Sequence, residues 1–187
     1  INPTERTPYV TISLIAVTTP TAIAVFCGSG PGAEPGYVQS ARAMGRALAE
    51  RGITLVYGGG GFGMMGAAAD GALEAGGSVI GVIPRMLIDK ERAHPGVQDM
   101  RIVETMAERK TVLLEAADAA VALPGGLGTA DELFEAQTWA QLGIAPMPTG
   151  VLNVSGFFDP LVAWLERATE AGFIHPDSPG RPVVADE

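Results

Sequence analysis

The sequence has a single cysteine, few basic residues and no long hydrophobic run. Because Cys27 has no second cysteine to pair with, an internal disulfide is excluded and nothing requires an oxidising compartment. The apolar run VTISLIAV near the start is eight residues long, whereas a membrane-spanning helix needs roughly 20. Twelve basic residues against twenty-one acidic ones give a net charge of −9, which disfavours a partner held by its phosphate backbone. We therefore expect a cytoplasmic protein that binds neither membranes nor nucleic acids.

The sequence contains enough apolar residues to form the buried core of one domain. Of its 187 residues, 47% are hydrophobic, which suits a single buried core in a chain of this length. We expect residues 1–20 to be an N-terminal extension without regular structure and residues 21–174 to form the folded domain. The tail 175–187 is rich in proline and acid and is expected to lie loosely on the surface.

Short apolar runs alternate with longer stretches of helical period, which is typical of a parallel sheet with helices on both faces. The runs are apolar along their length, as in strands buried on both faces. The predicted fold class is therefore α/β, a doubly wound, Rossmann-like parallel sheet in a single domain. The polar segment 84–96 is expected to be a loop without an element of its own. The predicted strands are 21–27, 53–58, 78–83, 100–104, 119–124 and 148–154, and the predicted helices are 35–51, 64–75, 106–117, 129–142 and 157–171.

Three predicted strands run directly into glycine-rich loops: FCGSGPG (26–32), YGGGGFGMMG (57–66) and PGGLGT (124–129). Tight strand-to-helix turns explain many such glycines. In a doubly wound sheet, however, all three loops lie at the carboxyl ends of the strands, where ligands bind. Glycine lets backbone N–H groups approach a ligand closely, and a helix that begins there turns its positive end toward an anion. The loops together predict a phosphate site, with candidate contacts at Gly28, Ser29, Gly59 and Gly60.

Two of these loops also match the dinucleotide fingerprint, as GSGPGA from residue 28 and GFGMMG from residue 61. That fingerprint calls for an acid at the end of the next strand, where it holds a ribose diol. The next strands end in YG and in IPR, so neither place holds a carboxylate. Arg85 is compatible with a 2′-phosphate, which keeps an NADP-dependent oxidoreductase as a weaker alternative.

Glu108, Arg109 and Lys110 lie in the first turns of the predicted helix 106–117. They can form an ordinary solvated turn. Two cations at the start of a helix oppose its dipole, however, and an anionic ligand nearby removes that conflict. Arginine offers a planar fork that matches phosphate or carboxylate, and lysine offers a point charge.

Thr129 and Glu132 allow two interpretations. Thr129 is expected at the N-cap or in the first turn of the helix 129–142, and Glu132 then has the spacing of a capping box. Alternatively Glu132, one turn from the phosphate site, faces the sugar of a bound nucleotide. Asp131 then points elsewhere, about 100° around the helix.

With these residues together, the sequence resembles the Lonely Guy (LOG) family of cytokinin riboside 5′-monophosphate phosphoribohydrolases, which were once widely labelled lysine decarboxylases. PGGLGTADE (124–132) fits the family signature PGGxGTxxE, and MAERK (106–110) fits its M-x-x-R-K element. FCGSGPG, YGGGGFGMMG and TWAQLGI follow in the family's order, and the resemblance covers residues 21–174. It implies a Rossmann-like fold, usually dimeric, that hydrolyses the N-glycosidic bond of an N6-substituted AMP to free base and ribose 5-phosphate. It also implies that no metal and no redox cofactor takes part.

The resemblance assigns roles to individual residues. Arg109 and Glu132 become the catalytic pair. Ala107 stands where histidine is frequent in the family, and Leu127 where tyrosine is frequent, which leaves the base preference open. The implied substrate contacts are Glu91, Lys110, Gly125, Gly126, Leu127, Gly128, Thr129, Ala130, Asp131 and Thr138.

The chemistry fits these residue types. Breaking the bond between ribose C1′ and a purine nitrogen leaves positive charge on the sugar. An ionised Glu132 stabilises that charge directly or by orienting the attacking water. Arg109 stays protonated, so we expect it to hold the phosphate or ribose and to orient Glu132. A non-catalytic nucleotide or cofactor carrier on the same fold is the second interpretation, and such a carrier needs no carboxylate beside the sugar.

The remaining conspicuous side chains have structural interpretations. Cys27 closes an apolar strand and is expected to be a small buried side chain rather than a reactive thiol. His94 and His175 have no nucleophile with which to pair. Trp139 and Leu142 share a helical face and are expected to be core or dimer contacts.

Overall fold

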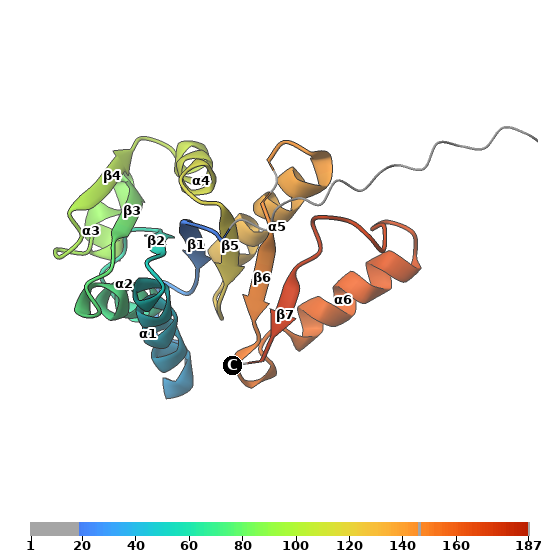
Figure 1. Cartoon of the computed structure of the whole chain (residues 1–187), viewed down its shortest axis with the longest axis horizontal. Helices are drawn as coiled ribbons and strands as arrows, with labels where there is room; N and C mark the ends of the chain where they lie inside the picture. Colours follow the sequence, from blue (N-terminus) through green and yellow to red (C-terminus); the bar gives the residue numbers. More distant parts are fainter. Residues whose placement is uncertain (1–18, 146, 187) are drawn as a thin grey trace, which may run out of the picture.

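The computed structural model describes residues 19–145 and 147–186, and its architecture is the α/β fold that the sequence predicts (Figure 1). Residues 1–18 of the expected N-terminal extension lie outside the described residues. The strands are β1 (Ala22–Phe26), β2 (Thr54–Tyr57), β3 (Val79–Pro84), β4 (Asp99–Val103), β5 (Ala119–Ala122), β6 (Thr149–Leu152) and β7 (Val183–Ala185).

The strands form one parallel sheet in the order β4-β3-β2-β1-β5-β6-β7. The chain runs outward from β1 to β4 and then returns to β5, on the other side of β1. The strand order therefore reverses between β1 and β5, which pair from Ile23 with Ala119 to Phe26 with Ala122. In folds of this class, ligands bind beside the carboxyl ends of the strands at that point.

Helices cover both faces of the sheet. One buried cluster joins the sheet to α1 and α2, and a second joins it to α4 and α5. Both faces of the central strands are therefore removed from water, which explains why their sequences are apolar without alternation. The helices are α1 (Pro35–Glu50), α2 (Gly63–Glu74), α3 (Ile88–Glu91), α4 (Met106–Glu115), α5 (Leu127–Leu142) and α6 (Asp159–Glu170), with short 3-10 turns η1 (Arg85–Leu87) and η2 (Val154–Gly156).

Local sequence explains two helix starts. Pro35 occupies the first turn of α1, where a missing N–H costs nothing. Thr105 is the N-cap of α4, because its hydroxyl accepts a hydrogen bond from the Glu108 N–H at 3.1 Å. The Glu108 carboxylate in turn accepts from the Glu104 N–H at 2.9 Å. Glu108 is thus used in capping, which leaves Arg109 and Lys110 as the charged residues of the M-x-x-R-K element to be explained.

Every predicted strand and helix is present, with ends shifted by a few residues, but three expectations were wrong. The segment 84–96 contains η1 and α3 rather than loop alone. The tail 175–187 is not merely loose, because β7 within it pairs with β6. Finally, α5 begins at Leu127 rather than at Thr129.

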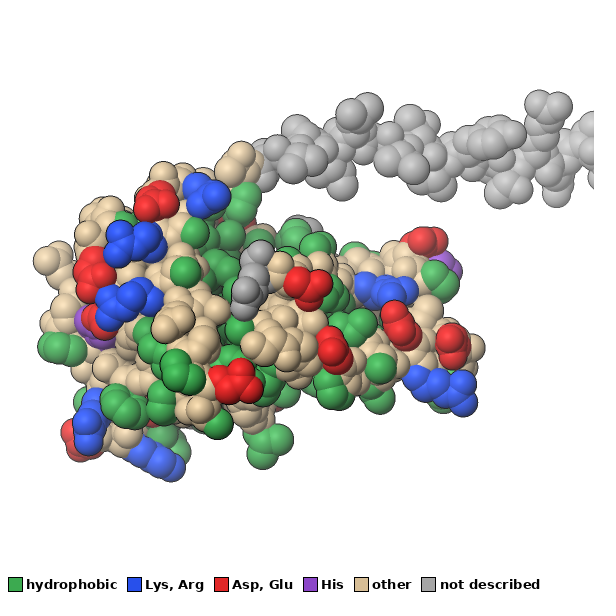
Figure 2. Space-filling model, turned by 90° about the horizontal axis from the view of Figure 1, so that it is seen from below, with side chains coloured by type: hydrophobic (Ala, Val, Ile, Leu, Met, Phe, Trp, Pro, Cys, Tyr) green, Lys and Arg blue, Asp and Glu red, His purple; other side chains and the backbone are tan. Residues whose placement is uncertain are grey.

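The surface mixes charges of both signs. Figure 2 shows Lys and Arg side chains beside Asp and Glu side chains both at the end of the molecule formed by α1 to α3 and along α6. Over the described part of the chain, no helix combines the length and apolarity that crossing a membrane would take.

Candidate active site

The first and third glycine loops meet at the reversal point of the sheet. The Gly28 N–H donates a 3.0 Å hydrogen bond to the Pro124 carbonyl, which joins the loop after β1 to the loop after β5. A Cβ on Gly125 would overlap the Thr129 hydroxyl and approach the Gly28 nitrogen, so only glycine permits this contact. Between the loops lies a cavity of about 250 Å³, lined by Gly28, Ser29, Gly30, Gly32, Tyr37, Met64, Pro124, Gly125, Gly126 and Phe157.

The N-terminus of α5 borders this cavity. Gly126 is the N-cap and supplies no side-chain cap, and the first intrahelical donor is the Ala130 N–H, which bonds to the Gly126 carbonyl at 3.1 Å. The N–H groups of Leu127, Gly128 and Thr129 therefore precede the hydrogen-bonded ladder of the helix. Thr129 is the third helical residue and is buried, so it lies in the first turn and is not the N-cap, and the capping-box interpretation of Thr129 and Glu132 is wrong. Exposed N–H groups at a helix start favour an anion.

Arg109 is buried at the centre of the site, with 5% of its surface exposed. Its Nη2 donates to the Gly58 carbonyl at 2.8 Å and lies 3.4 Å from Oε2 of Glu91. A Cβ on Gly58 would overlap the guanidinium, so the second glycine loop is shaped around this side chain. The Arg109 Nε is buried and has no hydrogen-bond partner among the described residues. A buried donor without a partner is costly, and a ligand oxygen would satisfy it.

Glu132 of α5 lies within electrostatic range of Arg109 and Glu91, and its charge is poorly hydrated there. Burial raises the pKa of its carboxyl from 4.5 to about 7, and the neighbouring Glu91 and Asp131 also raise it, while Arg109 and Lys110 oppose them. Burial and the nearby Glu132 raise the pKa of the Cys27 thiol to about 12. Cys27 is therefore an inert buried side chain, as its sequence position indicates.

Lys110 takes part in a different set of contacts. Its Nζ lies 3.1 Å from Oδ2 of Asp131 and also pairs with Glu135. The hydrogen bond to Glu135 is the main reason why the pKa of Lys110 is raised. Asp131 thus pairs with Lys110 at the surface, while Glu132, about 100° around the helix, lies inside between Phe26 and the α4 side chains Lys110, Leu113 and Leu114. The two cations at the start of α4 both pair with acidic side chains of the protein, Arg109 with Glu91 and Lys110 with Asp131 and Glu135. These cations therefore do not by themselves require an anionic ligand.

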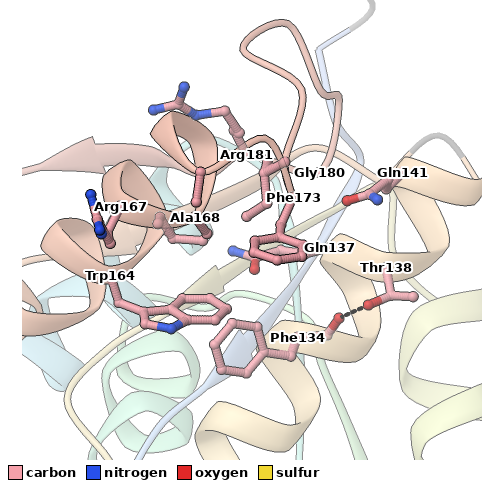
Figure 3. A pocket seen from close by; sticks show the side chains of 13 residues that line it. Phe134, Gln137, Thr138, Gln141, Trp164, Arg167, Ala168, Phe173, Gly180 and Arg181 are labelled. Atoms are coloured by element: carbon pink, nitrogen blue, oxygen red, sulfur yellow. Dashed lines mark hydrogen bonds between the residues drawn. The ribbon is translucent and has the colours of Figure 1, made fainter.

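Thr138 lies away from this cluster. It is six residues beyond Glu132, about 9 Å further along α5, and its hydroxyl donates to the Phe134 carbonyl at 2.7 Å. It lines a separate cavity of about 620 Å³ between α5 and α6, whose wall includes Phe134, Trp164 and Phe173 (Figure 3). Within one chain the structure therefore does not bring Thr138 to Arg109 and Glu132.

Of the other predicted contacts, two lie in the second glycine loop and one is exposed at the start of α5. Gly59 and Gly60 lie in the second loop, where Gly60 forms a bridge with Ala93 of the segment that carries Glu91. Leu127, at the first position of α5, is 92% exposed.

The sequence did not predict two aromatic residues that line the cavity between the loops, Tyr37 and Phe157, whose rings meet edge to face at 5.8 Å. No sequence pattern places Phe157, which follows η2, beside a residue of α1.

The structure weakens the dinucleotide alternative. Arg85, the residue compatible with a 2′-phosphate, is exposed and donates to the Glu104 carboxylate at 3.1 Å. A carboxylate beside that position repels a phosphate. Across residues 19–145 and 147–186, no group of three or more His, Cys, Asp and Glu side chains is arranged to hold a metal ion.

The family model described as possible lysine decarboxylase matches residues 65–187. A cytokinin riboside 5′-monophosphate phosphoribohydrolase of Rhodococcoides fascians is 42% identical over 181 residues, which are 96% of this chain and 91% of that protein. The rice LOG enzyme of the same name is 47% identical over 156 residues, which are 83% of this chain and 64% of that protein. An Arabidopsis thaliana relative with this name is 44% identical over 82% of this chain and 71% of its own length.

Solved structures share the fold at lower identity. A molybdenum cofactor carrier protein from Chlamydomonas reinhardtii superimposes with a TM-score of 0.66 at 24% identity, over 89% of each chain. A molybdenum cofactor binding protein from Rippkaea orientalis gives 0.62 at 23% identity, again over 89% of each chain. At such identities the likeness concerns the fold alone. The matched family model and the identities to the bacterial and plant enzymes show that this chain belongs to the Lonely Guy family of cytokinin riboside 5′-monophosphate phosphoribohydrolases.

Proposed function

We propose that this protein hydrolyses the N-glycosidic bond of an N6-substituted adenosine 5′-monophosphate and releases free base and ribose 5-phosphate. The observation that carries the proposal is the cluster of the buried Arg109 with the partly buried Glu91 and Glu132 beside the glycine loops, with the Arg109 Nε still lacking a partner among the described residues. The names of the related bacterial and plant enzymes support the same reaction.

Glu132 acts on the sugar. As the bond from C1′ to the purine nitrogen breaks, the base leaves with the bonding electrons and positive charge develops on the ribose. The ionised Glu132 stabilises this charge and accepts a proton from the water whose oxygen attacks C1′. One water is consumed: its hydroxyl, with one proton, joins C1′, and the other proton, accepted by Glu132, balances the one gained by the purine. A carboxyl whose pKa is about 7 suits this exchange near neutral pH.

The glycine loops and the α5 N-terminus hold the 5′-phosphate. The linked loops after β1 and β5 supply backbone amides from Ser29 and residues 125–129, next to the cavity of about 250 Å³. Arg109 stays charged at any accessible pH and contributes its free donor to a phosphate or ribose oxygen. The phosphate is remote from the bond that breaks, so its binding energy serves to fix the orientation of the sugar against Glu132.

A direct assay tests this function. The protein is incubated with AMP and with isopentenyladenosine monophosphate, and free base and ribose 5-phosphate are measured. We expect both products in equal amounts from at least one of the two nucleotides, and none of them from the Glu132→Gln variant above a trace. Tight nucleotide binding without turnover by the wild type would instead indicate a carrier, and hydride transfer with NADP would indicate the oxidoreductase.

We further propose that the protein acts as a homodimer in the cytoplasm. Large apolar side chains remain exposed on α5 and α6, among them Leu142 at 66% and Trp164 at 54% exposure, and a second copy would cover such side chains. A buried cysteine with a raised pKa needs no oxidising compartment. Sedimentation equilibrium should give twice the mass of one chain, and cell fractionation should place the protein with cytosolic markers.

A further inference from the structure

The segment that carries Glu91 is attached to the second glycine loop mainly through its backbone. The Gly61 N–H donates to the Arg92 carbonyl at 2.6 Å and to the Glu91 carbonyl at 3.3 Å, and the His94 N–H donates to the Gly59 carbonyl at 3.0 Å. Asp89, Lys90 and Arg92 are exposed. These bonds join the segment to the loop that leads into α2 at Gly63, and the Arg92 guanidinium lies over the Phe62 ring of that loop, 5.7 Å from its centroid.

His94 supplies a side-chain attachment to α2. Its side chain is 9% exposed, and its Nε2 lies 3.1 Å from Oδ1 of Asp70. Its Nδ1 accepts the Gly96 N–H at 3.1 Å, which leaves Nε2 as the nitrogen that carries the proton toward Asp70. Asp70 is held in turn by Arg42, whose Nη2 lies 3.0 Å from Oδ2. A chain of contacts therefore runs from α1 through α2 and His94 to the segment that carries Glu91.

We propose that His94, together with Asp70, is a positioning residue that holds Glu91 against Arg109 and thereby sets the affinity for the nucleotide. The inference rests on the proposed function, because it assumes that Glu91 and Arg109 contact the substrate. His94 itself touches neither Arg109 nor Glu132 in any contact of the described residues. It acts through the segment, whose backbone leaves α3 with Arg92 at a φ of 51°, a conformation that non-glycine residues rarely adopt without support.

The first test separates substrate binding from chemistry. His94→Ala should raise KM about tenfold while kcat stays within about twofold, as expected when a contact that is equally strong in the ground and transition states is lost. His94→Gln, whose amide nitrogen can replace Nε2 toward Asp70, should restore most of the affinity. His175→Ala is the matched control. His175 forms the same local bond, from the Asp177 N–H to its Nδ1 at 3.2 Å, but lies in the exposed tail.

A double-mutant cycle then tests the route of the effect. If His94 acts through Glu91, His94→Ala should add little to the rise in KM already caused by Glu91→Gln. If the two substitutions raise KM by factors that simply multiply in the double variant, the proposal is overturned. An unchanged KM in His94→Ala would overturn it as well.

Hydrogen exchange keeps this test independent of catalysis. The amide protons of Gly61 and His94 should exchange at least tenfold faster in His94→Ala than in wild type, with no change in His175→Ala. If the wild type shows no turnover but the exchange rates change as expected, the proposed function is rejected, while the role of His94 in attaching the segment to α2 is supported. Unchanged exchange at both amides would reject the attachment itself.

Discussion

Glu132 is a carboxyl group placed where its charge is costly. Its partial burial raises the pKa of its carboxyl, and two further acids, Glu91 and Asp131, raise it as well. Arg109 and Lys110 only partly compensate, so the group loses its proton near pH 7 instead of near 4.5. Chemistry at a sugar carbon requires the ionised form, and the same high pKa makes that form a competent base.

The first prediction concerns the pH dependence of the reaction. We expect kcat/KM to rise with pH through a midpoint near 7, as Glu132 ionises, and to level off above it. Glu132→Gln should remove the rise and lower kcat by about 10² to 10³, the usual cost of deleting a preorganised charge. Rate profiles between pH 5.5 and 8.5 provide the measurement. Glu115→Gln, an exposed carboxylate at the end of α4, should keep the wild-type midpoint; a midpoint that survives in Glu132→Gln belongs to another group.

The second prediction concerns stability, and it has the opposite pH dependence. Because the folded-state pKa of Glu132 lies above its value of 4.5 in the unfolded chain, the folded state binds the proton more tightly. The stabilisation from this group is complete below pH 4.5 and is lost as the pH rises through 7. The loss amounts to about 3 kcal/mol as an upper estimate. Urea unfolding should show Glu132→Gln gaining stability over wild type at pH 8 but not at pH 4.5; an equal difference at both pH values would contradict this origin.

Arg109 and Glu132 could be proposed as site residues from the sequence because the motifs that carry the family resemblance, MAERK and PGGLGTADE, are local. The pairing of Lys110 with Glu135 and the overlap of any Gly58 side chain with Arg109 are tertiary facts, which depend on how α4 packs against α5 and the second loop. No pattern along the chain predicts these two contacts.

At the level of elements, the long periodic helices and the buried strands could be predicted, and the short or exposed elements could not. The strand β7 has three residues, all exposed, so it lacks the apolar signature of the central strands. The helix α3 spans only four residues. The start of α5 was misplaced because Gly126 caps it without a side-chain bond, while Thr129, the residue with capping chemistry, packs against Gly125 instead.

The third prediction tests the fit between the second glycine loop and α4. Gly58→Ala would place a methyl group on the Arg109 guanidinium, so either the loop or the arginine must move. We expect kcat/KM to fall about 10²-fold or more, since a small displacement of a positioning group is that costly, and stability to fall by about 1–3 kcal/mol. Gly36→Ala is the control, because open space surrounds that glycine in α1. Wild-type kinetics in Gly58→Ala would show that the contact does not matter to the site.

At the scale of the whole molecule, the site exists because the topology brings distant segments to one edge of the sheet. The loops after β1, β2 and β5 come from residues up to about 100 positions apart in the sequence, yet the first and third are joined by a backbone hydrogen bond. The strand-order reversal between β1 and β5 creates this juxtaposition. A ligand that contacts all three loops therefore ties together the α1–α2 side of the sheet and the α4–α5 side.

The fourth prediction follows from this bridging. A ligand that binds only the folded state at about 100 times its Kd raises the free energy of unfolding by about 2.7 kcal/mol. For a domain of this size that corresponds to about 5–10 °C in Tm. The comparison uses the Glu132→Gln variant, which should turn AMP over about 10² to 10³ times more slowly than wild type. We expect AMP and ribose 5-phosphate to produce this shift and adenosine at the same concentration to produce little of it, because the loops bind the phosphate. Calorimetry gives the comparison directly. An equal shift with adenosine and AMP would mean that the base or sugar, and not the phosphate, supplies the binding energy, and the assignment of the glycine loops would have to be abandoned.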